Sequence, residues 1–411
     1  MGKAHLRPHG LARVHCQRMA GQRRAQALIL IPLALAATIA RAQDTAGPPP
    51  DNEHYQLRAE LGAEYDSNAH RVEQVANAGG DVVGSFLQRL VLSGQLSDQV
   101  APRHAIAWSA TAAGKIFDAP AARSENVAIA QSSLIWRMAL GVHTSLAPSG
   151  TYYEAFQNWA PEGDPAGERR DFRSLAPTLE LRTGLSESLD LGVTAGYRSL
   201  LFKPDRDFDF DGPTAGVNLR WLYDTESGAD WEAHAGAALE HRGFAGPAHV
   251  GNCPPDGLPC PGFEARTDSF LMAQADVTRI GRILLGAGYA FHHNGSNSFG
   301  ETLLRHIAYA RIATALPMGL YVAARADLSF VFYRDSIPVA RANMTQMLAG
   351  KPFVNIEDEN RSSVRVDLSR DIGDRLRGLL RYTLYANELG SSGGTYRRHT
   401  LLLNLAFVFE K

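Results

Sequence analysis

The chain has 411 residues, of which 45% are hydrophobic and 20% charged, and its formal net charge is −2. This balance argues against a nucleic-acid-binding protein, because phosphates need a basic protein face. Beyond residue 42 no apolar run approaches the ~20 residues that a transmembrane helix needs. If the protein resides in a membrane, it must therefore cross with strands that close into a barrel, because hydrocarbon satisfies no backbone hydrogen bonds.

Residues 1–42 are typical of a cleaved signal peptide. Basic residues from Lys3 to Arg24 precede the apolar run Ala27–Ala40, and Ala40-Arg41-Ala42 provides a small-residue cleavage site. Cleavage after Ala42 would remove seven positive charges and leave 34 basic and 43 acidic side chains, a formal net charge of −9. We expect residues 43–51 to form a short periplasmic segment and residues 52–411 to form the folded domain.

Residues 52–411 predict an all-β domain of about sixteen short amphipathic strands, within a range of about fourteen to eighteen. Tight connections, such as Leu185–Ser188 and Arg279–Arg282, alternate with long polar ones, such as Gln157–Phe172 and Gly243–Arg266. This asymmetry is typical of a closed antiparallel transmembrane β-barrel with short periplasmic turns and long extracellular loops. A water-soluble secreted β-protein is the alternative. Pro177 conflicts with the sixth predicted strand, because a closed barrel has no free edge where its missing N–H would be harmless.

The predicted strands have two different faces. In the first, Leu57 and Leu61 alternate with Arg58 and Glu60. Aromatic residues gather near the strand ends on the apolar faces: Tyr65, Trp136, Tyr197, Trp221, Tyr223, Tyr289, Phe291, Phe330, Phe332, Phe407 and Phe409. We interpret them as interfacial girdles on a lipid-facing surface. Ordinary enrichment of aromatic residues in strands would account for any one of them.

Three stretches carry a resemblance to known proteins. The last predicted strand, Thr400–Phe409, resembles the C-terminal signal of outer-membrane barrels, although Glu410 and Lys411 follow its final aromatic residue. The stretches Leu61–Asn68 and Tyr289–Asn297 are similar to segments of porin-like outer-membrane proteins of Gram-negative bacteria, including barrels associated with exopolysaccharide export. The resemblance implies a channel in the cell outer membrane.

The polar faces supply candidate pore-lining residues. They are charged and of both signs: Arg58, Glu60, Arg89, Arg137, Glu180, Arg182, Arg198, Arg220, Glu232, Asp276, Arg325, Asp327, Arg365, Asp367 and Arg381. Facing rows of opposite charge could order polar solutes at a constriction, or the pairs could merely stiffen the wall. Small positions such as Gly192, Gly286 and Gly288 predict room for water.

Cys253 and Cys260 would be the only cysteines left after cleavage, and both lie in one predicted extracellular loop. Disulfides persist in that oxidising compartment, so we expect a structural bridge and no metal site there. Asp207, Asp209 and Asp211 match the first half of a calcium loop, but the position that should supply a bidentate glutamate is Asn218. They remain a weak calcium candidate, with a solvated acidic loop as the alternative.

The longest loop, Arg334–Asn360, contains apolar residues that would suit either a plug in the pore mouth or a short surface helix. No G-x-S-x-G or H-E-x-x-H motif occurs, so we expect no enzyme activity, and we expect no cofactor.

The sequence therefore favours a channel for a polar solute or polymer, with exopolysaccharide export implied by the resemblance. A general or solute-specific diffusion porin and a non-conducting barrel serving as adhesin or assembly partner are the alternatives. The expected partners are outer-membrane lipid and lipopolysaccharide, the barrel-assembly machinery through the C-terminal strand, and a periplasmic polysaccharide-export component.

Overall fold

A computed structural model describes residues 54–70, 82–157, 171–203, 206–224, 230–253, 258–335, 361–386 and 396–410. The proposed signal peptide and periplasmic segment lie outside these residues. None of the described helices is long and apolar enough to cross a membrane.

The described part of the chain is almost entirely strand. The strands are β1 (His54–Asp66), β2 (Ser85–Ala101), β3 (His104–Phe117), β4 (Val127–Ala139), β5 (Thr144–Gln157), β6 (Phe172–Gly184), β7 (Leu189–Phe202), β8 (Phe210–Asp224), β9 (Asp230–Cys253), β10 (Leu258–Ile280), β11 (Ile283–Ser296), β12 (Leu303–Leu316), β13 (Leu320–Tyr333), β14 (Ser362–Ile372), β15 (Leu376–Ala386) and β16 (Arg397–Glu410). Three short 3-10 helices, η1 (Pro120–Glu125), η2 (Arg206–Phe208) and η3 (Pro317–Gly319), lie in connections.

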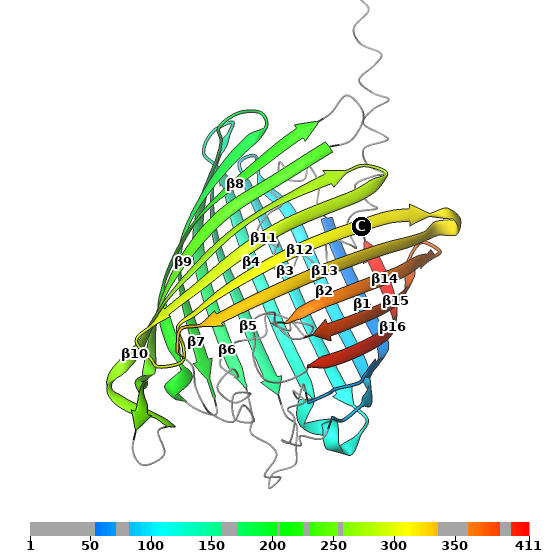
Figure 1. Cartoon of the computed structure of the whole chain (residues 1–411). Helices are drawn as coiled ribbons and strands as arrows, with labels where there is room; N and C mark the ends of the chain where they lie inside the picture. The colour runs from blue at the N-terminus through cyan, green and yellow to red at the C-terminus, as the bar shows by residue number, and fades with distance from the viewer. Residues whose placement is uncertain are drawn as a thin grey trace, which may run out of the picture. The chain divides into compact units, whose positions relative to one another are not determined.

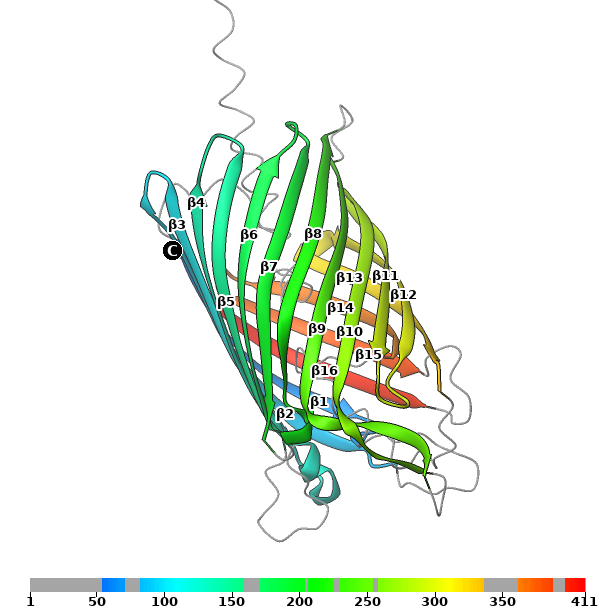
Figure 2. The same cartoon turned by 90° about the vertical axis from the view of Figure 1, so that its left-hand side faces the viewer.

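These strands form one closed antiparallel barrel, as the sequence predicts. Each strand pairs with its neighbours in the chain, and β1 pairs with β16 to complete the wall. Figures 1 and 2 show this seam, with the blue first strand beside the red last one. Closure leaves no unpaired strand edge, which is the condition for a sheet to cross hydrocarbon.

The connections divide the barrel into two ends. At the turn end, neighbouring strands are joined by short segments such as residues 102–103, 185–188 and 281–282. At the loop end the connections include residues 67–84, 118–126 and 297–302. One predicted loop is wrong: most of Gly243–Arg266 is strand, because β9 and β10 continue as a long hairpin past their neighbours, with register shifts among residues 258–267.

The outward face of the wall is apolar and exposed. Leu57, Leu61 and Tyr65 on β1 point outward at 56%, 65% and 39% exposure, whereas Gln56, Glu64 and Asp66 on the other face are buried. Of the predicted girdle residues, nine are large exposed hydrophobics: Tyr65, Trp136, Tyr197, Trp221, Tyr223, Tyr289, Phe332, Phe407 and Phe409. Phe291 and Phe330 share their face and are half-buried. An apolar outer band with aromatic residues is the surface of a transmembrane barrel.

Proline is accommodated by local gaps in the ladder. Despite the expected conflict between Pro177 and a closed barrel, β6 runs through this residue. It keeps its pairing with β5, where Pro177 lies opposite Gly150. On the β7 side, pairing stops at Leu175 and resumes at Thr178 in the same register. The wall therefore tolerates the missing N–H by omitting two ladder positions on one side only.

Candidate functional site: the lumen-facing wall

The strand register places every predicted pore-lining residue on one face. Arg89 lies opposite Gly62, Glu180 opposite Ala147, and Asp276 opposite His234, so the same parity continues around the barrel. All fifteen predicted residues are buried or half-buried, in contrast to the exposed apolar residues beside them. They therefore lie on the face that encloses the lumen.

Charged side chains of β13, β14, β15 and β1 form what we call the charged wall: Arg325, Asp327, Arg365, Asp367, Arg381, Arg58 and Glu60. Arg325 donates from Nε and Nη2 to the Asp327 carboxylate at 2.7–3.0 Å. Arg381 donates two hydrogen bonds to Asp367 at 2.8 and 3.1 Å. Such bidentate pairs fix both partners in orientation.

The charged wall continues across the seam. Arg58 Nε lies 2.8 Å from Glu60 Oε1, and Asn404 of β16 donates to the other oxygen of Glu60 at 2.7 Å. Arg365 Nε lies 3.8 Å from Asp367 Oδ2, an oxygen that also accepts from Arg381. Each carboxylate is therefore held by a cation or an amide of its own strand or of a neighbouring strand.

A second group lies on β8, β9 and β10 toward the turn end. Glu232 accepts a hydrogen bond from Arg220 Nε at 2.9 Å and lies 2.9 Å from His234 Nε2. The other ring nitrogen of His234 is 3.9 Å from Asp276. Cationic and acidic groups thus alternate across three strands.

Arginines of β6, β7 and β9 form further pairs on the same face. Arg182 binds Glu180 at 2.8 Å. Glu240 is shared by Arg198 at 3.5 Å and Arg242 at 3.0 Å. Arg242 and Glu240 were not predicted as lining residues, although their alternation along β9 would have identified them.

At the loop end of the lumen face, charged pairs are buried more deeply. Asp66 is fully buried and accepts from Arg398 at 2.6 Å, while Glu64 binds Lys115 at 3.3 Å. A similar pair farther round, Arg266 and Asp268, has a 2.7 Å contact. These residues are not among the predicted pore-lining residues, because a solvated lining was expected and they are among the least accessible charges of the wall.

An apolar cluster also lies on the lumen face, at the loop end of β2–β8. This inner apolar cluster consists of Val91, Ala113, Ile129, Tyr153, Ala155, Phe172, Leu200 and Phe210. Tyr153 stacks on Phe172 with ring centroids 5.3 Å apart. Strand alternation in the sequence assigns apolar residues to the lipid side and therefore does not predict this patch.

Glycines in the lumen do not leave the space expected for water. A Cβ at Gly286 would come within 2.5 Å of Arg311 Nε, and one at Gly288 within 2.4 Å of Tyr309. Gly192 is similarly filled by Asn218. The expectation was wrong because large side chains on adjacent strands occupy the room that the glycines provide.

Connections at the loop end carry the remaining predicted features. Cys253 and Cys260 form a disulfide near the tip of the β9–β10 hairpin, with Cα atoms 6.0 Å apart. Asp209 Oδ1 accepts the backbone N–H of Phe202 at 2.5 Å, and no group of three His, Cys, Asp or Glu side chains among the described residues could hold a metal ion. Asp207, Asp209 and Asp211 belong to no such group among the described residues, and a calcium site there stays a prediction. Most of the Arg334–Asn360 loop lies outside the described residues.

One titratable contact links two loop-end connections. His70 Nδ1 lies 3.1 Å from Glu125 Oε1 at the end of η1. This hydrogen bond, against partial burial of the imidazole, raises the pKa of His70 above its usual range. Ala69 and Ala122, from the same two connections, pack on Leu87 and Phe117.

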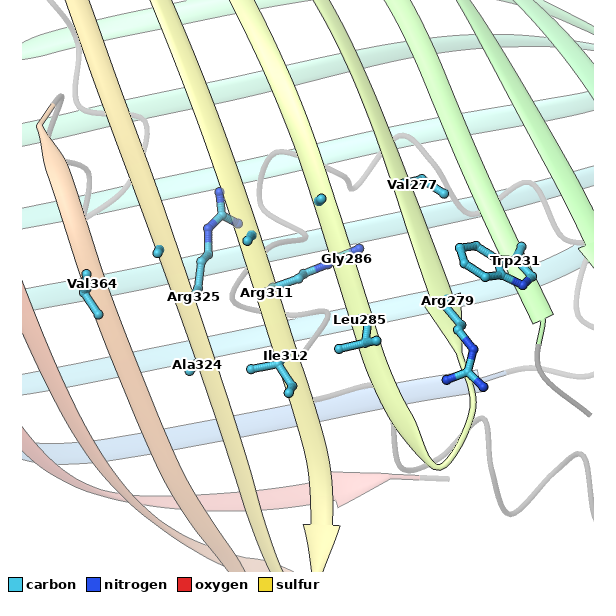
Figure 3. A pocket seen from close by; sticks show the side chains of 13 residues that line it. Trp231, Val277, Arg279, Leu285, Gly286, Arg311, Ile312, Ala324, Arg325 and Val364 are labelled. Carbon is cyan, nitrogen blue, oxygen red and sulfur yellow. The ribbon is translucent and has the colours of Figure 1, made fainter. Parts of the chain in front are cut away.

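The outer surface bears a shallow apolar groove of about 480 Å³ across β10–β14. Figure 3 shows it, with Trp231 and Arg279 near the β10–β11 turn. Its floor is low because Ala287, Ala310 and Ala326 pair in one row across three strands. We treat it as part of the lipid-facing surface.

No protein-family model matches the chain, and no curated protein matches it. Among solved structures, the chain is similar to Salmonella typhi OmpF at 11% identity, with a TM-score of 0.43 and coverage of 86% of this chain and 97% of that one. Acinetobacter baumannii OccAB1 gives 10% identity, a TM-score of 0.44 and coverage of 90% and 99%. CdiB from Acinetobacter baumannii gives 10% identity, a TM-score of 0.46 and coverage of 85% and 60%.

Proposed function

We propose that the protein is an outer-membrane channel through which small polar and charged solutes diffuse. The observation that carries the proposal is the charged wall. Its side chains are paired yet retain solvent contact, with 31% exposure for the side chain of Arg325, 25% for Arg365 and 21% for Asp327. A barrel of sixteen strands is wide enough for an aqueous channel.

The wall would select solutes by charge as well as by size. Arg325, Arg365 and Arg381 lie on three successive strands, and their carboxylate partners lie on the same strands or the next. Groups of fixed charge attract ions of opposite sign and repel those of the same sign over roughly one Debye length, ~8 Å at physiological salt. Small charged solutes would therefore experience the wall as they pass.

The orientation follows from the asymmetry of the two ends. We propose that the short-turn end faces the periplasm and the loop end the outside, as is general for such barrels. The role of the β16 strand in recognition by the assembly machinery remains a prediction. So do the absence of enzyme activity, export of a carbohydrate polymer with a periplasmic partner, and a non-conducting adhesin or assembly role.

Conductance of single molecules tests the proposal. The chain lacking residues 1–42 would be refolded and inserted into planar bilayers under a salt gradient. We expect steady open channels. Arg325→Gln with Arg365→Gln should shift the reversal potential toward cation preference, and Asp327→Asn with Asp367→Asn toward anion preference.

The matched control is Val366→Ala, between Arg365 and Asp367 but on the exposed outer face. It should leave conductance and reversal potential unchanged. A correctly folded protein that conducts no ions would contradict the proposal. Conductance that ignores both pairs of lumen substitutions would show that the charged wall does not select.

A further inference from the structure

Three charged residues on the outer wall break the apolar pattern of the lipid-facing surface. Tyr153, Phe172 and Phe202 point toward the lumen, so their chain neighbours Glu154, Arg173 and Lys203 point outward. All three lie at the loop ends of β5, β6 and β7, next to one another around the barrel. We call Glu154, Arg173 and Lys203 the outer charged cluster.

The cluster is built around a single carboxylate. Lys203 Nζ lies 2.9 Å and Arg173 Nη2 lies 3.2 Å from the same oxygen, Glu154 Oε1. The Tyr152 hydroxyl donates to the other oxygen, Oε2, at 2.6 Å. Glu154 therefore positions both cations while its own charge neutralises only one of them.

The two cations are the accessible part of the cluster. The side chain of Arg173 is 46% exposed and that of Lys203 42%, whereas that of Glu154 is 13% exposed. Lys203 Nζ lies 4.8 Å from the centre of the Phe156 ring, and the Arg173 guanidinium 6.0 Å from that of Tyr152. Each cation therefore contacts Glu154 and an aromatic ring, and the rest of its charged group remains accessible to a ligand.

We propose that the outer charged cluster binds a phosphate group of lipopolysaccharide, the phosphorylated glycolipid of the outer leaflet. This inference rests on the outer-membrane location and orientation proposed above. A guanidinium offers paired donors that match phosphate geometry, and an ammonium adds a mobile point charge. Aromatic side chains such as Tyr152 and Phe156 are suited to the level where acyl chains meet headgroups. A phosphate would supply the negative charge that Glu154 alone does not provide for Arg173 and Lys203.

The charge complementarity also predicts the effect of the carboxylate. A phosphate and Glu154 compete for the same donors on Arg173 and Lys203. Removing the negative charge with Glu154→Gln should therefore tighten phosphate binding. A purely structural role for the cluster would predict no change in lipid binding from this substitution.

Native mass spectrometry of the refolded protein in a neutral detergent would measure binding of three probes: bisphosphorylated lipid A, dephosphorylated lipid A and phosphatidylglycerol. We expect Arg173→Ala with Lys203→Ala to weaken binding of bisphosphorylated lipid A by about tenfold or more, since each charge-assisted contact contributes measurably to affinity. Dephosphorylated lipid A should bind weakly to both proteins.

The matched control is Arg279→Ala with Arg282→Ala at the β10–β11 turn, which removes two cations from the opposite end of the barrel. It should leave lipid A binding unchanged. Equal losses in both double variants would indicate a general charge effect and overturn the site. Phosphatidylglycerol binding that depends on Arg173 and Lys203 as strongly as lipid A binding would overturn the choice of lipopolysaccharide. Conductance would be measured on the same variants. Channels that conduct normally without binding lipid A would contradict the lipid site alone, whereas a folded protein that binds lipid A without conducting would contradict the channel alone.

Discussion

Two regions of the lumen face are built from different chemistry. On β13–β1 the charged wall carries paired arginines and carboxylates that keep part of their contact with solvent. On β2–β8 the inner apolar cluster buries Leu200 at 3% and Phe172 at 5% exposure. Apart from the outer charged cluster at the loop ends of β5–β7, both regions have an outward surface of exposed aliphatic and aromatic residues.

The difference teaches that strand alternation fixes which residues share a face but does not fix what the inner face must contain. The outer face of a transmembrane barrel meets mainly hydrocarbon, and its composition is therefore mainly apolar. The inner face meets water, neighbouring side chains and connections, so it is charged in one sector and apolar in another. We expect the apolar sector to serve stability and the charged sector to serve conduction.

The largest expected loss of stability concerns the buried Asp66–Arg398 pair at the loop end. Asp66→Ala would leave Arg398 buried without its main carboxylate, which should cost about 3–5 kcal/mol of unfolding free energy. Unfolding in denaturant, followed by tryptophan fluorescence, measures it. The control is Asp371→Ala, which breaks a pair with Arg377 in which the acid is 40% exposed and should cost about 0–1 kcal/mol. Similar losses would mean that burial does not distinguish the two pairs.

The inner apolar cluster provides the next test. Leu200→Ala removes a nearly fully buried side chain and should cost about 2–5 kcal/mol of unfolding free energy while leaving ion selectivity unchanged. Leu201→Ala, on the next residue and the outer face, should cost less because lipid can fill the space. A shift in reversal potential caused by Leu200→Ala would place the apolar sector in the conduction path and break the distinction.

A smaller, pH-dependent effect is expected where His70 contacts Glu125 at the loop end. The pKa of His70 is raised in the folded protein by Glu125. Its contribution is therefore fully present below the ordinary histidine pKa, near 6.5, and is lost as pH rises through the higher folded value. We expect less than about 1 kcal/mol, because the pair is partly exposed. His70→Gln should remove this pH dependence of the unfolding free energy. If the unfolding free energy changes with pH equally in the variant and the unsubstituted protein, His70 is not the group responsible.

The β9–β10 hairpin tip lies outside both lumen sectors and should give the smallest effect on the barrel. Replacing Cys253 and Cys260 with serine should leave conductance and the unfolding midpoint unchanged while making the tip more sensitive to protease. Intact mass before and after alkylation under non-reducing conditions tests whether the bridge forms. A large fall in the barrel's unfolding midpoint would show that the hairpin is coupled to the wall.

The sequence was sufficient for the architecture because a transmembrane barrel repeats a single rule. Period-two alternation in strands such as 55–65 and 320–332 defines the faces, and the alternating lengths of the connections define the two ends. Strand number and antiparallel closure followed from counting these units. Pro177 and the continuation of β9 past Gly243 escaped prediction, because both depend on which hydrogen bonds a neighbouring strand can omit.

The candidate site was predictable by face but not by partner. Arg325 and Asp327 lie two residues apart on one strand, so their contact is visible in the sequence. The Asp66–Arg398 pair, in contrast, depends on how the last strand registers against the first. Phe172 and Phe210 were assigned to no site, because an apolar residue at a strand end has the same pattern whether it faces lipid or a packed part of the lumen.

The Asp66–Arg398 contact joins residues separated by 332 positions in the chain. During synthesis β2 becomes available soon after β1, but the second neighbour of β1 is β16, which is made last. Until then both barrel edges remain open and can pair wrongly with other chains. Because such non-local pairing is slow to form, we expect the seam between β1 and β16 to close late in folding. The first strand to be synthesised is thus among the last to acquire both of its neighbours.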